Sequence, residues 1–393
     1  MNRHPRLDRL GAYPFERLES LLADLTINSD LPLINAGAGE PRLPLPDFVA
    51  DTLQDNLDGF SRYPPTRGSL TLRQSIADWL MRRYPGIAVD ADTQLLTANG
   101  TREALFAIAH AAIDPEADER PFVLLPNPMY QIYLGAAWMA GATPYPVPAL
   151  PASGFQPDWQ QLPDEVWSRA ALIYCCSPSN PTGWVADAET YRYLLDRAQQ
   201  SDALLVADEC YSEIYYRTPP VGLLQVAAEI GHRDFANAIV FNSLSKRSAL
   251  PGLRSGLIAG DSRWIERFAK LRSYTGAATP LPLQRVAAKA WSDERHVADN
   301  LNIYRDSLDA FYTALGRGEP ADGGFFVWLP VPDDQQFARE AFAQLSIKLL
   351  PGSFLGVAGD GGVNPGEGFV RIALVDGVDR ARELGERLRS LLP

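Results

Sequence analysis

The sequence predicts an α/β fold, in which a mostly parallel sheet is wrapped by helices in a large domain and a smaller α+β domain follows it. The first observation is that helical patterns alternate with short apolar runs from about Pro46 onward, which is typical of a parallel sheet with helices on its faces. The second is that the apolar runs are continuous, as expected for strands buried on both faces. The expected strands are residues 122–125, 171–176, 203–207 and 238–241.

The other elements follow from local patterns. Residues 13–25 carry aromatic and leucine residues at helical spacing, so we expect an N-terminal arm with one apolar face. After about Gln284 the pattern predicts one long helical stretch through Ala310 and then short strands near residues 325–328 and 369–374. Helices between the strands of the sheet are expected over residues 70–83, 101–112 and 189–200.

Two changes of pattern divide the chain into three predicted segments. Residues 1–45 form the arm and the first segment of the small domain, residues 46–284 the large domain, and residues 285–393 the small C-terminal domain. The glycine-rich residues 352–368 predict a mobile surface loop, with a functional lid as the alternative.

The composition argues against several classes of protein. Hydrophobic residues make up 46% of the 393 residues and charged residues 21%, which is typical of soluble globular proteins, and no apolar run approaches a membrane span. The net charge of −12 opposes binding to nucleic acid. Cys175, Cys176 and Cys210 lack metal-ligand spacing with histidine and indicate small core residues in a reducing compartment. Because no secretory signal is recognisable, we expect a cytoplasmic protein without a nucleic-acid or membrane partner.

Polar or turn residues follow each expected strand directly. In open α/β sheets ligands bind outside the carboxyl ends of the strands. Four candidate segments are therefore expected to meet at one edge of the sheet. They are residues 127–130, 177–183, 208–211 and 243–246.

Lys246 lies in the last of these segments, among small hydroxyl residues. A lysine amine becomes a useful nucleophile when its pKa is lowered or an electrophile is held beside it, and a Schiff base with pyridoxal phosphate is the commonest such case. Ser243, Ser245 and Arg254 could then hold the phosphate, because a guanidinium pairs two phosphate oxygens and hydroxyls satisfy the others. The alternative is an ordinary solvated loop.

A second phosphate-binding feature is expected where residues 101–112 begin their helix. Gly100, Thr101 and Arg102 lie at its N-terminus, where free backbone N–H groups and the helix dipole bind anions. Simple capping by Asn99 or Thr101 would explain the same residues and is compatible with phosphate binding.

At this point the chain resembles the class I pyridoxal-phosphate aminotransferases of fold type I, with matching motifs from Gly39 to Arg371. The resemblance implies a pyridoxal 5′-phosphate cofactor, with amino acids and 2-oxo acids as substrates. It also implies that Lys246 holds the cofactor as a Schiff base and later moves a proton as general base and acid. Ser255 departs from the aliphatic residue or alanine that is usual there, and we expect this to alter packing and not chemistry.

The resemblance implies roles for further residues around the cofactor ring. Asp208 would pair with the pyridine nitrogen and favour the protonated ring. Asn180 and Tyr211 would donate hydrogen bonds to the ring 3-oxygen, and Tyr130 would stack on the ring. Each has a simpler explanation: a helix cap for Asp208, a turn for Asn180 and core packing for the two tyrosines.

The same resemblance implies how substrate and subunits are held. Arg371 would fork onto the substrate α-carboxylate, and Gly39 would contact that group through its backbone. An arginine in an apolar strand is costly to bury without an anionic partner, which favours this role over a snorkelling side chain. Tyr63 would reach the phosphate of the neighbouring subunit, so a homodimer with shared active sites is implied.

Within the family, several segments are most similar to bacterial N-succinyl-L,L-diaminopimelate aminotransferases of lysine biosynthesis, with 2-oxoglutarate and glutamate as the second pair. Such a substrate carries a distant carboxylate, for which a further basic residue is expected. The alternatives are an aspartate, aromatic or branched-chain aminotransferase, a pyridoxal-phosphate β-lyase or decarboxylase, and a non-enzymatic regulator. A regulator would need an added DNA-binding domain. The candidate residues for the distant carboxylate are Arg42, Arg62, Arg67 and Arg102.

Overall fold

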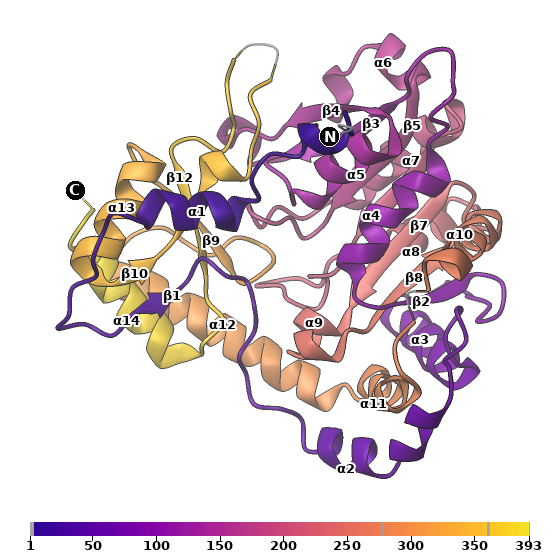
Figure 1. Ribbon diagram of the computed structural model, residues 1–393, viewed down its shortest axis with the longest axis horizontal. Coiled ribbons are helices and arrows are strands. Elements are labelled where there is room, and N and C mark those ends of the chain that lie inside the picture. The colour runs from indigo at the N-terminus through magenta and orange to yellow at the C-terminus, as the bar shows by residue number, and fades with distance from the viewer. Residues whose placement is uncertain (1–3, 277, 360–361, 393) are drawn as a thin grey trace.

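The computed structural model describes residues 4–276, 278–359 and 362–392 and contains a large α/β part and a smaller α+β part (Figure 1). The large part is built on a seven-stranded sheet with the order β2-β8-β7-β6-β5-β3-β4. Strand β8 is antiparallel to both of its neighbours, and the other pairs are parallel. The predicted fold class is therefore confirmed. The strands are β2 (Leu95–Ala98), β3 (Phe122–Asn127), β4 (Thr143–Pro148), β5 (Ala170–Cys176), β6 (Leu204–Asp208), β7 (Ala238–Ser243) and β8 (Gly256–Gly260).

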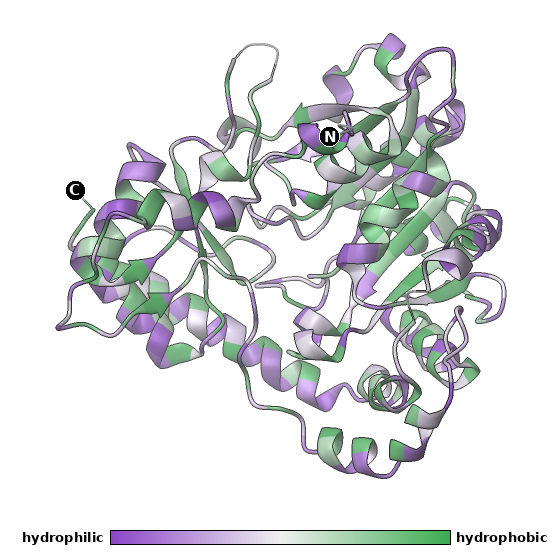
Figure 2. Cartoon of the chain, viewed as in Figure 1, coloured by the Kyte–Doolittle hydropathy of each residue, from purple (hydrophilic) through white to green (hydrophobic). Residues whose placement is uncertain are grey.

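The sheet separates two apolar cores. Successive residues of a strand point to opposite faces, so Leu124 joins one core while Val123 and Leu125 join the other. Both faces are covered by helices, and hydrophobic residues gather in the sheet and on the inner sides of these helices (Figure 2). One face is covered by α3 (Leu70–Arg83), α7 (Ala188–Gln200), α8 (Leu223–Glu229) and α11 (Leu281–Ser292), and the other by α4 (Thr101–Ala112), α5 (Ile132–Ala140) and α10 (Ser262–Thr275).

The smaller part contains an antiparallel sheet with the order β11-β12-β9 and a short parallel pair between β1 and β10. The first chain segment joins this part, because β1 pairs with β10 and α1 packs against α13 and β11. The elements are α1 (Pro14–Leu22), β1 (Ile34–Asn35), α12 (Arg295–Leu315), β9 (Phe326–Pro330), α13 (Asp334–Leu345), β10 (Ile347–Lys348), β11 (Leu350–Pro351), β12 (Phe369–Ala373) and α14 (Val378–Arg389). The predicted domain limits stay a prediction, and α11 runs across the limit at residue 284.

Short helices complete the chain. Three of them are α-helical, and the others are single 3₁₀ turns in the connections. The α-helices are α2 (Phe48–Gln54), α6 (Asp164–Ser168) and α9 (Leu244–Arg247), and the 3₁₀ helices are η1 (Leu7–Arg9), η2 (Leu57–Ser61), η3 (Pro151–Ser153), η4 (Trp159–Gln161), η5 (Pro251–Leu253) and η6 (Gly352–Phe354). None of the helices in the described ranges is long and apolar enough to cross a membrane.

Two predicted elements differ from the structure. The single helix expected after Gln284 is wrong, because the chain breaks between α11 and α12, where Asp293 is extended and its carboxylate accepts from the Arg295 N–H at 2.7 Å. The surface loop expected at residues 352–368 is wrong at its start. Residues 352–355 are buried, and a Cβ on Gly352 would lie 2.3 Å from the Gly366 carbonyl oxygen, so glycines here permit close backbone packing.

Candidate active site

A cavity of about 670 Å³ lies at the carboxyl ends of β5, β6 and β7 and is closed by the arm, the segment after β1 and the smaller part. All but two of the residues predicted for the site line it, so the structure brings these residues together. Those that line it are Gly39, Thr101, Arg102, Tyr130, Asn180, Asp208, Tyr211, Ser243, Ser245, Lys246, Arg254 and Arg371.

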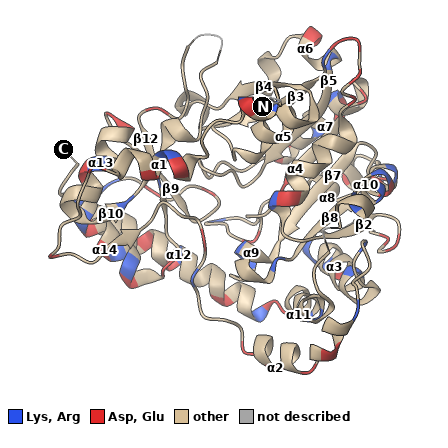
Figure 3. Cartoon of the chain, in the orientation of Figure 1, with Lys and Arg blue, Asp and Glu red and all other residues tan. Residues whose placement is uncertain are grey.

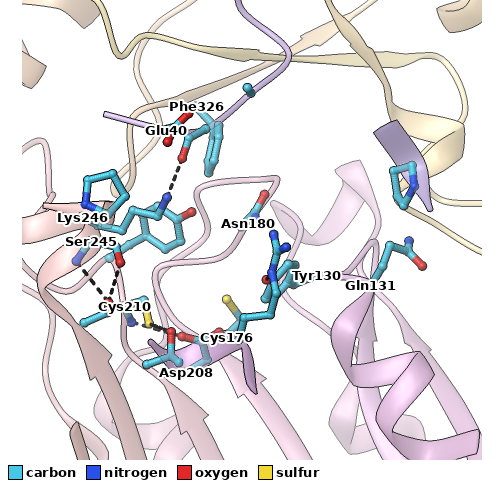
Figure 4. A pocket seen from close by; sticks show the side chains of 18 of the residues that line it. Glu40, Tyr130, Gln131, Cys176, Asn180, Asp208, Cys210, Ser245, Lys246 and Phe326 are labelled. Atoms are coloured by element: carbon cyan, nitrogen blue, oxygen red, sulfur yellow. Dashed lines mark hydrogen bonds between the residues drawn. The ribbon is translucent and has the colours of Figure 1, made fainter. Parts of the chain in front are cut away.

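Lys246 lies on α9 directly after β7, and its side chain reaches across the cavity (Figure 4). Its Nζ donates to the Gly39 carbonyl oxygen at 2.5 Å and lies 5.8 Å from the centre of the Tyr211 ring. Burial lowers the pKa of the amine to about 8. The amine therefore loses its proton far more readily than an exposed lysine, which a nucleophile or proton carrier requires.

The hydroxyls after β7 and the start of α4 form a small polar cradle. Ser243 Oγ donates to Ser245 Oγ at 2.9 Å and accepts from the Ser245 N–H. Arg254 donates only to carbonyl oxygens, at 2.8 Å from Pro251 and 3.2 Å from Asn99, and has no carboxylate partner among the described residues. Its guanidinium lies against the backbone of Gly100, where a Cβ would meet Nη2 at 1.8 Å. Gly100 has a φ of +81° and precedes the first turn of α4, so it supports this cradle although it does not line the cavity.

Asp208 is the last residue of β6 and is 4% exposed. Tyr133 donates its hydroxyl to Oδ2 at 2.6 Å, and the Cys210 N–H donates to Oδ1 at 3.2 Å. Burial raises the pKa of this carboxyl, and no described cation lies within ion-pair distance of it. Figure 4 shows it at the strand ends, beside Cys176 and Cys210. A cationic N–H group bound here would offset the cost of burying the charge.

Arg371 reaches the cavity from β12 in the smaller part. Its Nη1 donates to Asn180 Oδ1 at 2.8 Å and its Nη2 to the Gly37 carbonyl oxygen at 2.7 Å, while the buried Nε has no hydrogen-bond partner in the described part of the chain. Burial lowers the pKa of the guanidinium to about 10. Because Asn180 accepts through its oxygen, its amide N–H₂ remains available to a ligand.

Arg102 and Tyr130 lie together at the mouth of the cavity. Arg102 Nε donates to the Tyr130 hydroxyl at 2.6 Å, and the guanidinium lies 5.7 Å from the centre of the Tyr13 ring. Arg102 forms no ion pair with any described carboxylate. Tyr63 lies outside the cavity and is 98% exposed. Its contact with the cofactor phosphate of a neighbouring subunit stays a prediction.

Some lining residues were missed by the sequence reasoning. The arm contributes Tyr13 and Phe15, and β9 contributes Phe326. Cys176 and Cys210 are buried, as expected, but they also line the cavity, and Cys210 Sγ lies 3.2 Å from Thr101 Oγ1. Both cysteines follow the strand-end rule, which could have identified them, whereas no local pattern links the arm to the strand ends.

The lining residues fit pyridoxal phosphate. The helix N-terminus, two serine hydroxyls and an arginine without a carboxylate partner suit a phosphate. The buried, cation-free Asp208 suits a protonated ring nitrogen, and Lys246 lies within the same cavity as a low-pKa amine.

Comparisons with known proteins agree with this chemistry. The model of the family "Aminotransferase class I and II" matches residues 32–382. The chain is 32% identical over 401 residues to an LL-diaminopimelate aminotransferase of Moorella thermoacetica, covering 98% of this chain and 97% of that protein. An aminotransferase structure from Neisseria meningitidis aligns with a TM-score of 0.94 and 39% identity over 99% of both chains. Aminotransferase AspB from Helicobacter pylori gives 0.90 and 33% over 97% of this chain and 98% of that one. The chain therefore belongs to the class I and II aminotransferases, which are pyridoxal-phosphate-dependent enzymes.

Proposed function

We propose that this aminotransferase takes its amino group from N-succinyl-L,L-diaminopimelate and exchanges it with the 2-oxoglutarate and glutamate pair, in the cytoplasm, as a step of lysine biosynthesis. The carrying observation is a cavity whose wall holds three arginines that form no ion pair with any described carboxylate, Arg102, Arg254 and Arg371. Two carboxylates also line it, Glu40 and the buried Asp208, and neither forms an ion pair with a described cation. The cofactor phosphate and two of the three carboxylates of this substrate would pair with the three arginines, and a protonated ring nitrogen would pair with Asp208.

Separate groups of lining residues would hold the phosphate and the ring of the cofactor. Pyridoxal phosphate supplies an electron sink that makes the substrate Cα–H bond acidic. The phosphate would be bound by the α4 N-terminus, Ser243, Ser245 and Arg254, and the ring nitrogen by Asp208. Asn180 and Tyr211 would donate to the ring 3-oxygen, and Tyr130 would pack against the ring.

Lys246 would move the proton of the reaction. Its amine has a pKa of about 8, so a useful fraction is uncharged near neutral pH and can accept the proton from the substrate Cα. The same amine would then return the proton to the cofactor carbon. Because Gly39 O accepts from Nζ, the amine already has a fixed direction within the cavity.

Arg371 would orient the substrate through its α-carboxylate. Its unpartnered buried Nε and the adjacent Nη groups provide donors for a carboxylate, and Asn180 holds the guanidinium in place. The Gly39 backbone would contact the same group. A Cβ at Gly39 would lie 2.8 Å from the Phe326 ring, so any side chain there would disturb this end of the cavity.

Among the four candidates for the distant carboxylate, Arg102 is favoured. Arg42 is paired with Asp376, Arg62 with Asp58 and Arg67 with Glu266, and none of the three lines the cavity. Arg102 lines it, and only a tyrosine hydroxyl accepts from its side chain among the described residues. Its predicted contribution to phosphate binding concerns the backbone at the α4 N-terminus, so the side chain is free for a second role.

A further part of the proposal concerns the assembly of two subunits and the role of Tyr63 in it. The family is typically dimeric, and Tyr63 projects from the surface with 98% exposure. We propose that it reaches the cofactor phosphate of a second subunit in a homodimer. Replacing it by Phe would then raise the concentration of pyridoxal phosphate needed for half-occupancy, without changing the fold.

The test compares amino donors on the purified enzyme with 2-oxoglutarate as acceptor. N-succinyl-L,L-diaminopimelate is expected to react with a kcat/KM at least tenfold above L,L-diaminopimelate, aspartate, phenylalanine and leucine. The relatives named LL-diaminopimelate aminotransferase make the unsuccinylated compound the sharpest competitor. If L,L-diaminopimelate reacts faster than its N-succinyl derivative, the proposed substrate is wrong, while the assignment as an aminotransferase stands. Release of pyruvate or CO₂ without an acceptor would instead indicate a β-lyase or decarboxylase.

A further inference from the structure

Helix α9, which carries Lys246, has two different faces. Ser245 and Lys246 line the cavity, whereas Leu244 and Arg247, three positions apart, are buried on the other side. A helix of four residues has almost no stability of its own, because nucleation costs more than one turn returns. The position of α9, and with it the reach of the Lys246 amine, therefore depends on what its buried face contacts.

Arg247 makes several of those contacts, although its buried Nε has no hydrogen-bond partner among the described residues. Its side chain is fully buried, Nη2 donates to both carboxylate oxygens of Glu294 at 3.0 Å, and Nη1 donates to the Ala290 carbonyl oxygen at 3.1 Å. The guanidinium packs beside two indole rings that contact each other, 5.1 Å from the centre of Trp79 and 4.9 Å from that of Trp291. In Figure 3 the basic residues of α9 lie next to α11.

Apart from Trp79, which lies on α3, these partners belong to the break between α11 and α12. Ala290 and Trp291 end α11, and Glu294 precedes α12. The backbone after Lys246 is tied to the same helix, because Asn300 donates to the Arg247 carbonyl oxygen at 3.2 Å and His296 Nε2 lies 2.8 Å from Ser248 Oγ. Helix α12 continues from this break into the smaller part, where it packs on α14 (Figure 1).

We propose that Arg247 is a positioning residue that fixes α9 against the α11–α12 break and so sets where the Lys246 amine can reach. The inference rests on the proposed role of Lys246 in the reaction. Stability alone does not call for an arginine here, since apolar residues of similar volume often replace a buried ion pair without loss. A planar, forked cation packed against two rings instead defines one orientation, which lysine or methionine cannot reproduce.

The test replaces Arg247 with Met, an apolar side chain that can still pack against the two indole rings. Arg197→Met is the matched control, because Arg197 also lies against two aromatic rings, Trp167 and Tyr193, and pairs with Asp164, but these partners lie on α6 and α7 and not on α9 or at the α11–α12 break. In R247M, amide hydrogen exchange of residues 244–250 is expected to rise at least tenfold, and kcat to fall ten- to a hundredfold with KM changed less than threefold. Borohydride reduction followed by peptide mass analysis is expected to recover less cofactor on Lys246. The control R197M is expected to leave hydrogen exchange, the kinetic constants and cofactor recovery unchanged.

Two further variants keep the outcome decisive. R247K retains the charge but not the fork, and it is expected to resemble R247M. If R247M does not fold, Glu294→Gln removes the ionic partner alone, and it is expected to raise exchange in 244–250 at least threefold. Wild-type exchange and kcat in the folded variants would overturn the proposal. Because exchange needs no turnover, it also decides whether Arg247 holds α9 if the chain fails to transaminate any donor.

Discussion

The cavity has two walls that were built in different ways. One wall comes from the large part and consists of residues that follow β5, β6 and β7, among them Asn180, Asp208 and Lys246. The other comes from the arm and the smaller part, with Tyr13 and Arg371. The first wall is fixed by a continuous sheet, whereas the second depends on how distant chain segments pack together.

Hydrogen bonds cross between the two walls. Arg371 Nη1 donates to Asn180 Oδ1, and Lys246 Nζ donates to Gly39 O. We infer different roles for the two walls. The wall at the strand ends of the large part, called the sheet-end wall, would carry the groups that move protons and stabilise charge. The wall from the arm and the smaller part would hold the substrate. Substitutions in the first wall should therefore lower kcat, and substitutions in the second should raise KM.

The largest effect is expected from Lys246→Ala. In its proposed role the amine both attaches the cofactor and carries the proton, so its loss should lower kcat by about 10³- to 10⁴-fold or more. The visible absorbance of the bound cofactor should also change. The measurement is steady-state turnover together with the absorbance spectrum, with exposed Lys270→Ala as the control. Wild-type turnover and spectrum in K246A would show that another residue does this chemistry.

Arg371→Lys tests the opposite wall. Lysine keeps a positive charge but cannot fork onto a carboxylate, so kcat/KM for the amino donor should fall about 100-fold, mostly through KM. Steady-state kinetics over a range of donor concentrations measure the two constants separately. A fall in kcat at unchanged KM would break the proposed division between the walls.

The sheet-end wall was largely predictable from sequence, because continuous apolar runs locate buried strands and the strand-end rule locates the ligand site. Asp208 and Ser243 follow directly from this rule. Strand β8 was not predicted, since its short run Gly256–Gly260 carries a glycine at each end, and neither was β4, which contains three prolines and is tolerated as an edge strand.

The second wall was harder to predict for a physical reason. Arg371 was identified through the family resemblance, supported by the argument that an arginine in an apolar strand needs an anionic partner, and Tyr13 gave no such signal. Its place beside Arg102 depends on the arm, which crosses from the large part to α1 on the smaller part. On the large part, Arg6 of the arm donates to the Met139 carbonyl oxygen at 3.4 Å. Such long-range packing leaves no periodic pattern in the sequence.

A third prediction concerns the pH dependence of stability. Burial lowers the pKa of Lys246 to about 8, below its value in the unfolded chain, so the folded state binds fewer protons and gains stability as pH rises from about 8 to 10.5. Because the side chain keeps some exposure to the cavity, the gain should be about 1–2 kcal/mol. Denaturant unfolding of the cofactor-free protein across this range should show it for the wild type and not for Lys246→Met. Parallel curves for the two proteins would mean that the amine is not desolvated.

The smallest effect is expected from Tyr13→Ala in the arm. The Arg102 guanidinium lies 5.7 Å from the centre of the Tyr13 ring, and a cation–π contact at an exposed site contributes about 0.5–1 kcal/mol. Loss of the ring should thus raise KM for a dicarboxylic donor about two- to fivefold and leave kcat unchanged, while Tyr13→Phe, which keeps the ring, should match the wild type. Steady-state kinetics with both variants decide the point, because an equal effect in Y13F would assign the contribution to the hydroxyl. A fall in kcat in either variant would mean that the arm belongs functionally to the sheet-end wall, since a segment that only positions Arg102 cannot slow the proton transfer at Lys246.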